Sequence, residues 1–235
     1  MTVSSHLLKG LLPTLPTSHS HFRYISLMKL CQLTTGGISL LVLTLFLKTS
    51  NINLLLLLIV FLGLLFNTQA LLLGNHLGIS EQLKSLNRWR YLIHDLCVPL
   101  LAVVAVEIAH YASTPWLQLS SVRYSAWILA LFVGATSFIA DYFNLDLRPE
   151  ESEGLLLYRP TAVIFPVPAI LTSLYLIAIG WSLWHQAHWP WLFCAAILSF
   201  GANAAPNQII GRLITTVSEL GLMVVLLQSV LQFSS

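Results

Sequence analysis

Apolar runs follow one another almost without interruption from about residue 30 to the end of this 235-residue chain. A helix needs ~20 mostly apolar residues to cross the hydrocarbon core of a membrane. Asp, Glu, Lys and Arg make up only 9% of the chain, too few to cover a soluble fold of this size. The pattern predicts an all-α polytopic integral membrane protein, a bundle of about seven transmembrane helices. The expected spans are residues 30–47, 53–73, 91–112, 124–143, 161–183, 190–205 and 209–231.

The basic residues between these spans predict an orientation in the membrane. Cytoplasmic connections carry an excess of Lys and Arg. With seven spans, nine of the eleven basic residues fall on one side, and only Lys48 and Arg123 fall on the other. Six of the seven tryptophans lie near the side poor in basic residues, at a membrane boundary that suits their amphipathic rings. We therefore expect a cytoplasmic N-terminus and a C-terminus on the opposite side.

The chain divides into a short tail and one membrane domain. Residues 1–28 contain no acidic residue and two prolines, which indicates a flexible cytoplasmic tail, with a targeting segment as the alternative. Residues 29–235 are expected to form a single seven-helix domain. The longest connection, residues 144–160, holds four of the nine acidic residues, and we expect it to be a solvated loop.

Several classes of site and partner find no support in the sequence. The net charge of +2 follows from the excess of Lys and Arg in the cytoplasmic connections and gives no reason to expect a nucleic-acid partner. The three cysteines are far apart, and His185 and His188 have no third ligand nearby, so we expect no metal site. No lysine lies inside a span, which excludes a retinal Schiff base, and the pattern identifies no cofactor.

Four acidic residues lie inside the expected spans, where a charge is costly and usually marks a functional site. They are Asp95, Glu107, Asp141 and Glu219. Glu219 is ten residues into the last span and therefore close to the middle of the membrane, with Arg212 two helical turns before it as a candidate partner. Asp95 and Asp141 lie near the cytoplasmic ends of their spans.

Other polar side chains gather in the same cytoplasmic half. Arg88 and Asp95 share one helix face, and Arg90 and His94 form a pair beside it. A carboxylate with a neighbouring imidazole can perform acid–base chemistry. The candidate catalytic residues are His94, Asp95, Asp141 and Glu219. The candidate substrate-binding residues are Arg88, Arg90, Asn67, Gln69, Asn144 and Arg212.

We expect spans two, three, four and seven to surround one polar cavity, and three kinds of function are compatible with it. The first is an enzyme acting on a lipid or isoprenoid-like substrate, with arginines holding an anionic head group. The second is a small-molecule or proton-coupled transporter that uses Glu219, with Gly211 and Gly221 allowing close helix packing. The third is a non-catalytic subunit, assembly factor or pigment-binding component of a larger complex. Membrane lipids are expected partners, and a membrane-protein partner or a homo-oligomer is left open.

Overall fold

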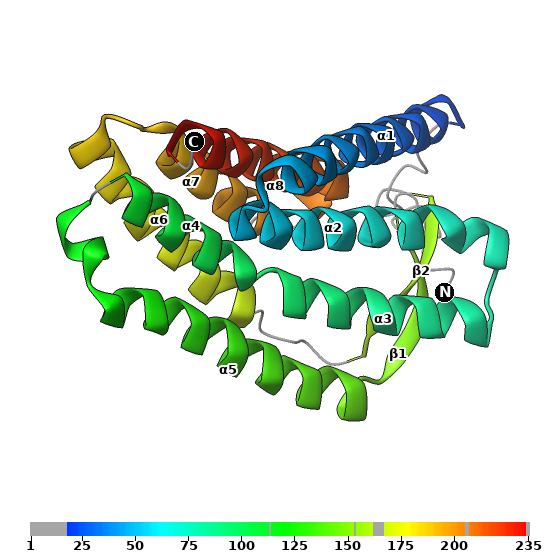
Figure 1. Cartoon of the computed structure of the whole chain (residues 1–235). Coiled ribbons are helices and arrows are strands. Elements are labelled where there is room, and N and C mark those ends of the chain that lie inside the picture. Colours follow the sequence, from blue (N-terminus) through cyan, green and yellow to red (C-terminus); the bar gives the residue numbers. More distant parts are fainter. Residues whose placement is uncertain (1–17, 113, 153, 162–166, 205–206, 234–235) are drawn as a thin grey trace, which may run out of the picture.

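The computed structural model describes residues 18–112, 114–152, 154–161, 167–204 and 207–233. These residues form a bundle of helices with one small β-hairpin at one end of the bundle (Figure 1). The helices are α1 (Ser18–Thr49), α2 (Ile52–Leu77), α3 (Glu81–Cys97), α4 (Leu100–Tyr111), α5 (Ser120–Asn144), α6 (Val167–Ala187), α7 (Trp191–Ala204) and α8 (Asn207–Phe233), with a 3-10 turn at Pro115–Gln118. The strands are β1 (Leu147–Ser152) and β2 (Leu155–Pro160), which pair antiparallel.

The all-α membrane fold expected from the apolar runs is confirmed. Five helical stretches in the described residues are long and apolar enough to cross a membrane, and α3 and α4 together make one of them. Helices are the natural result, because a backbone that crosses lipid must satisfy its hydrogen bonds internally. Helix α1 begins at Ser18, so residues 18–28 of the expected tail are helical, while residues 1–17 lie outside the described part.

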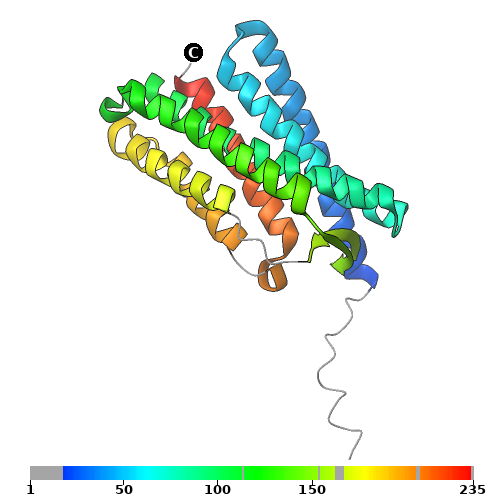
Figure 2. The same ribbon diagram turned by 90° about the horizontal axis from the view of Figure 1, so that it is seen from below.

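The outer faces of the bundle are strongly apolar. On α1, Leu33 and Leu40 are 75% and 65% exposed, and on α5, Leu131 and Phe132 are 69% and 67% exposed. Such surfaces are stable against lipid but not against water. Seen from below, α6 and α7 lie on one side of the bundle and α1 and α2 on the other, with α8 between the two pairs (Figure 2).

A proline divides the third transmembrane rod into α3 and α4. Pro99 has no N–H group, so the regular helical ladder cannot continue through it. The next two hydrogen bonds span three residues instead of four, from Leu101 N to Val98 O and from Ala102 N to Pro99 O, both 3.1 Å long. The rod starts at Glu81, so the polar residues between 88 and 95 do lie on one continuous helix.

The segment 144–160 was expected to be a solvated loop, and this prediction was wrong. Most of it is the β1–β2 hairpin, and Leu155 and Leu157 of β2 are almost fully buried. Asn75 of α2 fastens the turn and the start of β2, since its amide donates to Gly154 O and its carbonyl accepts from Leu156 N, each at 2.7 Å. Side chains of a strand point alternately to opposite faces, so Leu155 and Leu157 of "LLLYR" give β2 a buried face that the short acidic run before it had obscured.

Helix α8 has an irregular start. Gly211 has φ 72° and ψ 161°, a backbone conformation that residues with a side chain rarely adopt. The helix is broken there, and its straight part begins at Arg212. The Gly211 conformation therefore decides where the first charged residue of this helix lies.

Candidate functional site

A cavity of about 450 Å³ lies inside the bundle, between α2, α3, α4, α6, α7 and α8. Its walls are mostly aliphatic, with Leu64, Leu101, Leu176 and Leu222 among the lining residues. Cavities of ~300–1,000 Å³ with apolar walls and a few polar groups are typical of small-molecule sites. The cavity is therefore suited to an apolar molecule or the apolar part of an amphiphile.

His94 and Glu219 both line this cavity, although they are 125 positions apart in the sequence. His94 comes from the last turn of α3, just before the break at Pro99. Glu219 comes from the straight part of α8, one turn before Met223, which also lines the wall. The fold thus brings two of the four candidate catalytic residues to one apolar space.

The partner of Glu219 differs from the one that helix spacing suggested. Arg212 was the candidate, but the side chain that interacts with the Glu219 carboxyl group is that of Asn203 of α7. The Asn203 amide also donates to Ser199 O at 3.0 Å, which fixes its orientation. Asn203 lines the cavity together with Glu219, and sequence reasoning did not select it as a candidate site residue.

The hydroxyl group of Thr172 is another polar group of the cavity wall, and it has no hydrogen-bond partner among the described residues. Thr172 of α6 is 1% exposed, and within the described part of the chain nothing bonds to its hydroxyl oxygen. Buried hydroxyls are almost always satisfied, because leaving one unpaired costs ~1–3 kcal/mol. Since Thr172 lines the cavity, a polar atom of a bound molecule would satisfy it.

Three of the four spans that we expected around the cavity do line it, namely spans two, three and seven. Helix α5, the expected fourth span, contributes no residue to the lining, whereas α6 and α7 contribute half of the wall. Helix α5 packs against α3 and α4 on their far side. Sequence reasoning overlooked Thr172 and Ser199 because an isolated hydroxyl in an apolar helix is common and carries no spacing signal.

The remaining candidates lie outside the cavity lining. Asp95 and Asn67 are half-buried on α3 and α2. Gln69 of α2 is hydrogen-bonded by Gln32 of α1. Asp141 and Asn144 belong to the last turn of α5, but their side chains lie outside the described residues.

The arginines at the hairpin end have separate environments. Arg88 donates to Leu145 O at 3.2 Å and so ties α3 to the end of α5. Arg90 is buried, lies 4.5 Å from the ring centre of Tyr91, and is close enough to His94 to interact with it electrostatically. Arg212 interacts electrostatically with Arg90. Of the predicted binding residues, Arg90 and Arg212 therefore come together and Arg88 has a structural contact of its own.

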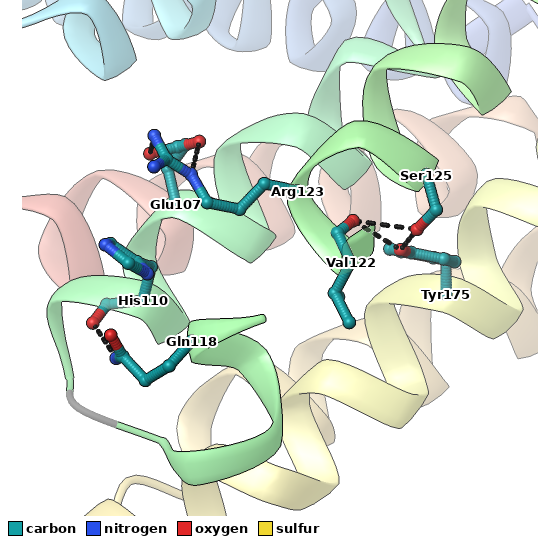
Figure 3. Close-up of polar contacts among 7 residues, drawn as sticks. All are labelled: Glu107, His110, Gln118, Val122, Arg123, Ser125 and Tyr175. Atoms are coloured by element: carbon teal, nitrogen blue, oxygen red, sulfur yellow. Dashed lines mark hydrogen bonds and ion pairs between the residues drawn. The ribbon is translucent and has the colours of Figure 1, made fainter. Parts of the chain in front are cut away.

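Glu107 is explained by an ion pair far from the cavity. Its two carboxylate oxygens accept from Nε and Nη2 of Arg123 at 2.8 and 2.9 Å (Figure 3). A nearby contact joins Gln118 to the backbone oxygen of His110. The basic residue that faces Glu107 comes from α5. Such a bidentate pair fixes α4 against α5, and it accounts for an acidic residue inside a span without a catalytic role.

The structure also bears on Gly221 and on the histidines that we considered as metal ligands. Gly221 was expected to allow close helix packing, but nothing lies within 4 Å of the position that a Cβ atom would occupy there. Among the described residues, no three His, Cys, Asp or Glu side chains lie together as metal ligands would. His185 instead packs against Trp181, with ring centres 4.3 Å apart.

Comparison with known proteins identifies no family for this chain. No protein-family model matches it, and no curated protein matches it either. Its function has to be argued from the cavity and the residues around it.

Proposed function

We propose that this membrane protein is an enzyme that takes a lipid or isoprenoid-like substrate into the cavity and acts on it by acid–base chemistry. The observation that carries the proposal is that His94 and Glu219 both line one apolar cavity of about 450 Å³. Ionisable groups within a membrane bundle are costly and are retained mainly where they have a role. An apolar substrate is expected because aliphatic side chains form most of the wall.

The two side chains have complementary roles in this proposal. A carboxyl group and an imidazole can donate and accept a proton at different stages of one reaction. Asn203 interacts with the Glu219 carboxyl group, and proton transfer to a bound substrate requires that this group is well positioned. Thr172 supplies a hydroxyl group that would bind a polar atom of the substrate next to its apolar chain.

Filling the cavity tests whether it binds an apolar molecule. Ala169 of α6 lines the cavity, and Ala169→Phe would occupy much of its volume. We expect the wild-type protein, purified from membranes in a mild detergent, to retain a lipid detectable by native mass spectrometry. The variant should lose this lipid by roughly tenfold or more, since a filled cavity cannot accept it.

The control for this experiment lies on the same helix. Ala178 is exposed on the outer face of α6 and does not line the cavity. Ala178→Phe makes the same chemical change and should leave the retained lipid unaltered. Equal lipid retention by the wild type and Ala169→Phe would count against a cavity ligand.

The orientation in the membrane is part of the proposal. The hairpin and the C-terminal end of α8 lie at opposite ends of the bundle (Figure 1). We propose that the hairpin end and the N-terminus are cytoplasmic. The native cysteines are replaced, and single cysteines are introduced at the exposed Glu151 and at Ser235. A thiol reagent that does not cross membranes should label position 235 in intact cells and position 151 only after the cells are permeabilised. Labelling of both positions from the same side would overturn this orientation.

A further inference from the structure

Three arginines from distant parts of the sequence meet at the hairpin end of the bundle. They are Arg90 of α3, Arg159 of β2 and Arg212 of α8. Arg212 interacts electrostatically with both of the others, and Arg90 also interacts with Arg159. Bringing like charges together in a partly desolvated place is unfavourable unless something of opposite charge compensates for it.

Among the described residues, one carboxylate forms an ion pair with a member of this group. Glu150 of β1 forms an ion pair with Arg159, with 3.0 Å between the two side chains. Arg90 has no such carboxylate within the described part of the chain, although it is only 7% exposed. Its Nε also has no hydrogen-bond acceptor among those residues, and its neighbour is the ring of Tyr91. An anion bound to it would explain a buried guanidinium group in this situation.

The hairpin and the Gly211 break together build this group. In β2, alternate residues point to the same face, so Arg159 shares the face of Leu155 and Leu157. These two leucines pack with Met28 of α1, and Leu213 of α8 packs against the same cluster. The straight part of α8 begins beside this cluster, so the positive end of its helix dipole faces the same place.

We infer that Arg90, Arg159 and Arg212 form a binding site for a phosphate or diphosphate group. The planar guanidinium group binds phosphate oxygens through paired N–H donors, and several arginines around one anion are the usual arrangement. Arg88 is not part of this site, because its guanidinium group is bound to Leu145 O.

The site is positioned to hold the head group of the molecule in the cavity, an assignment that rests on the proposed function. Arg90 lies one turn before His94 on α3 and interacts with it electrostatically. On α8, Arg212 precedes Glu219 by seven residues, which is roughly 10 Å along a helix axis. A phosphate at the arginines would therefore leave the apolar part of the same molecule beside both cavity residues. The substrate class would be a lipid or isoprenoid phosphate.

Affinity measurements on the full-length protein in a neutral detergent test the site. The first probe is inorganic pyrophosphate, and the second is dioleoyl phosphatidic acid in mixed micelles, with dioleoylglycerol as its uncharged counterpart. The dissociation constant is obtained from the rise in Tm with ligand concentration. We expect at least one phosphate probe to stabilise the protein, and Arg159→Gln to weaken its binding by about tenfold or more.

A matched variant controls for the general attraction between a basic protein and an anion. Lys84→Gln on α3 removes the same charge outside the arginine group and should change the affinity by less than about twofold. Should Arg159→Gln fold poorly because Glu150 loses its partner, the double variant Glu150→Gln/Arg159→Gln removes both charges of the pair. The inference is overturned when neither phosphate probe stabilises the wild type, or when the Arg159 variants weaken binding no more than Lys84→Gln does.

The two probes also distinguish the source of the phosphate. Binding of phosphatidic acid without binding of pyrophosphate assigns the site to a lipid head group, and equal binding of both assigns it to a soluble anion. Ala169→Phe should leave pyrophosphate binding unchanged, because it fills only the cavity. Failure of the cavity experiment alone would therefore remove the proposed enzyme function and leave the anion site standing.

Discussion

Glu219→Gln is expected to reduce the activity of the protein to the level of cells that lack it, at nearly normal abundance. Glutamine has the same shape and can still bind Asn203, so packing around α7 and α8 should be preserved. It cannot accept or release a proton, and proton transfer by a positioned side chain contributes ~10²–10⁴-fold to a rate. The measurement is the lipid composition of cells that express the wild type or the variant, with protein abundance and Tm determined in parallel.

The control for this variant is a carboxylate of the hairpin. Glu151 is exposed, and Glu151→Gln makes the same substitution away from the cavity, so it should leave the lipid composition unchanged. A Glu219→Gln protein that keeps both its activity and its Tm would show that the carboxyl group has neither a catalytic nor a structural role. A lower Tm with unchanged activity per molecule would assign Glu219 to helix packing.

Gly74→Ala is expected to be the most destabilising small substitution in the chain. A Cβ atom at this position of α2 would lie 1.7 Å from the backbone oxygen of Leu156, so the hairpin would have to move away. Overpacking of this kind typically costs ~1–3 kcal/mol, and a rigid backbone neighbour places this case at about 3 kcal/mol. Loss of the Asn75 hydrogen bonds to the hairpin should accompany it. Thermal unfolding in detergent, followed by tryptophan fluorescence, measures the effect.

Gly221→Ala provides the comparison. Nothing lies within 4 Å of its Cβ position, and the residue is inside α8, so alanine should stabilise the helix by up to ~1 kcal/mol. Equal Tm values for the two alanine variants would contradict the close approach of α2 and β2. Because Gly74→Ala displaces the strand that carries Arg159, it should also weaken phosphate binding, whereas Gly221→Ala should not.

In our proposal, the cavity and the arginine site bind separate parts of one ligand. The aliphatic wall accounts for an apolar chain, and Thr172 and Asn203 add polar contacts within it. Arg90 lies between the two regions, because it is grouped with Arg159 and is one turn from His94. A ligand with a phosphate head and an apolar tail would satisfy both regions at once.

The sequence by itself determined that the chain forms a helical membrane protein, and it also marked the charged residues inside the spans. Both follow from local properties. The length of an apolar run decides whether a helix can cross lipid, and a buried acid such as Glu219 is costly wherever its helix packs. For the same reason, the shared helix face of Arg88 and Asp95 was predictable from helix periodicity alone.

Only the tertiary structure decided which residues meet. The order of helices around the bundle and the rotation of each one depend on contacts between distant segments, so nothing in the local pattern excluded α5 from the cavity or brought α7 to it. Asn203 lies near Glu219 because α7 packs on α8, and Arg159 lies near Arg90 because buried leucines fasten β2 to the end of the bundle. The residues next to Asn203 and Arg159 in the sequence are those of an ordinary helix end and an ordinary loop. The residues with which the two side chains interact lie far away in the chain, so the local sequence does not identify them.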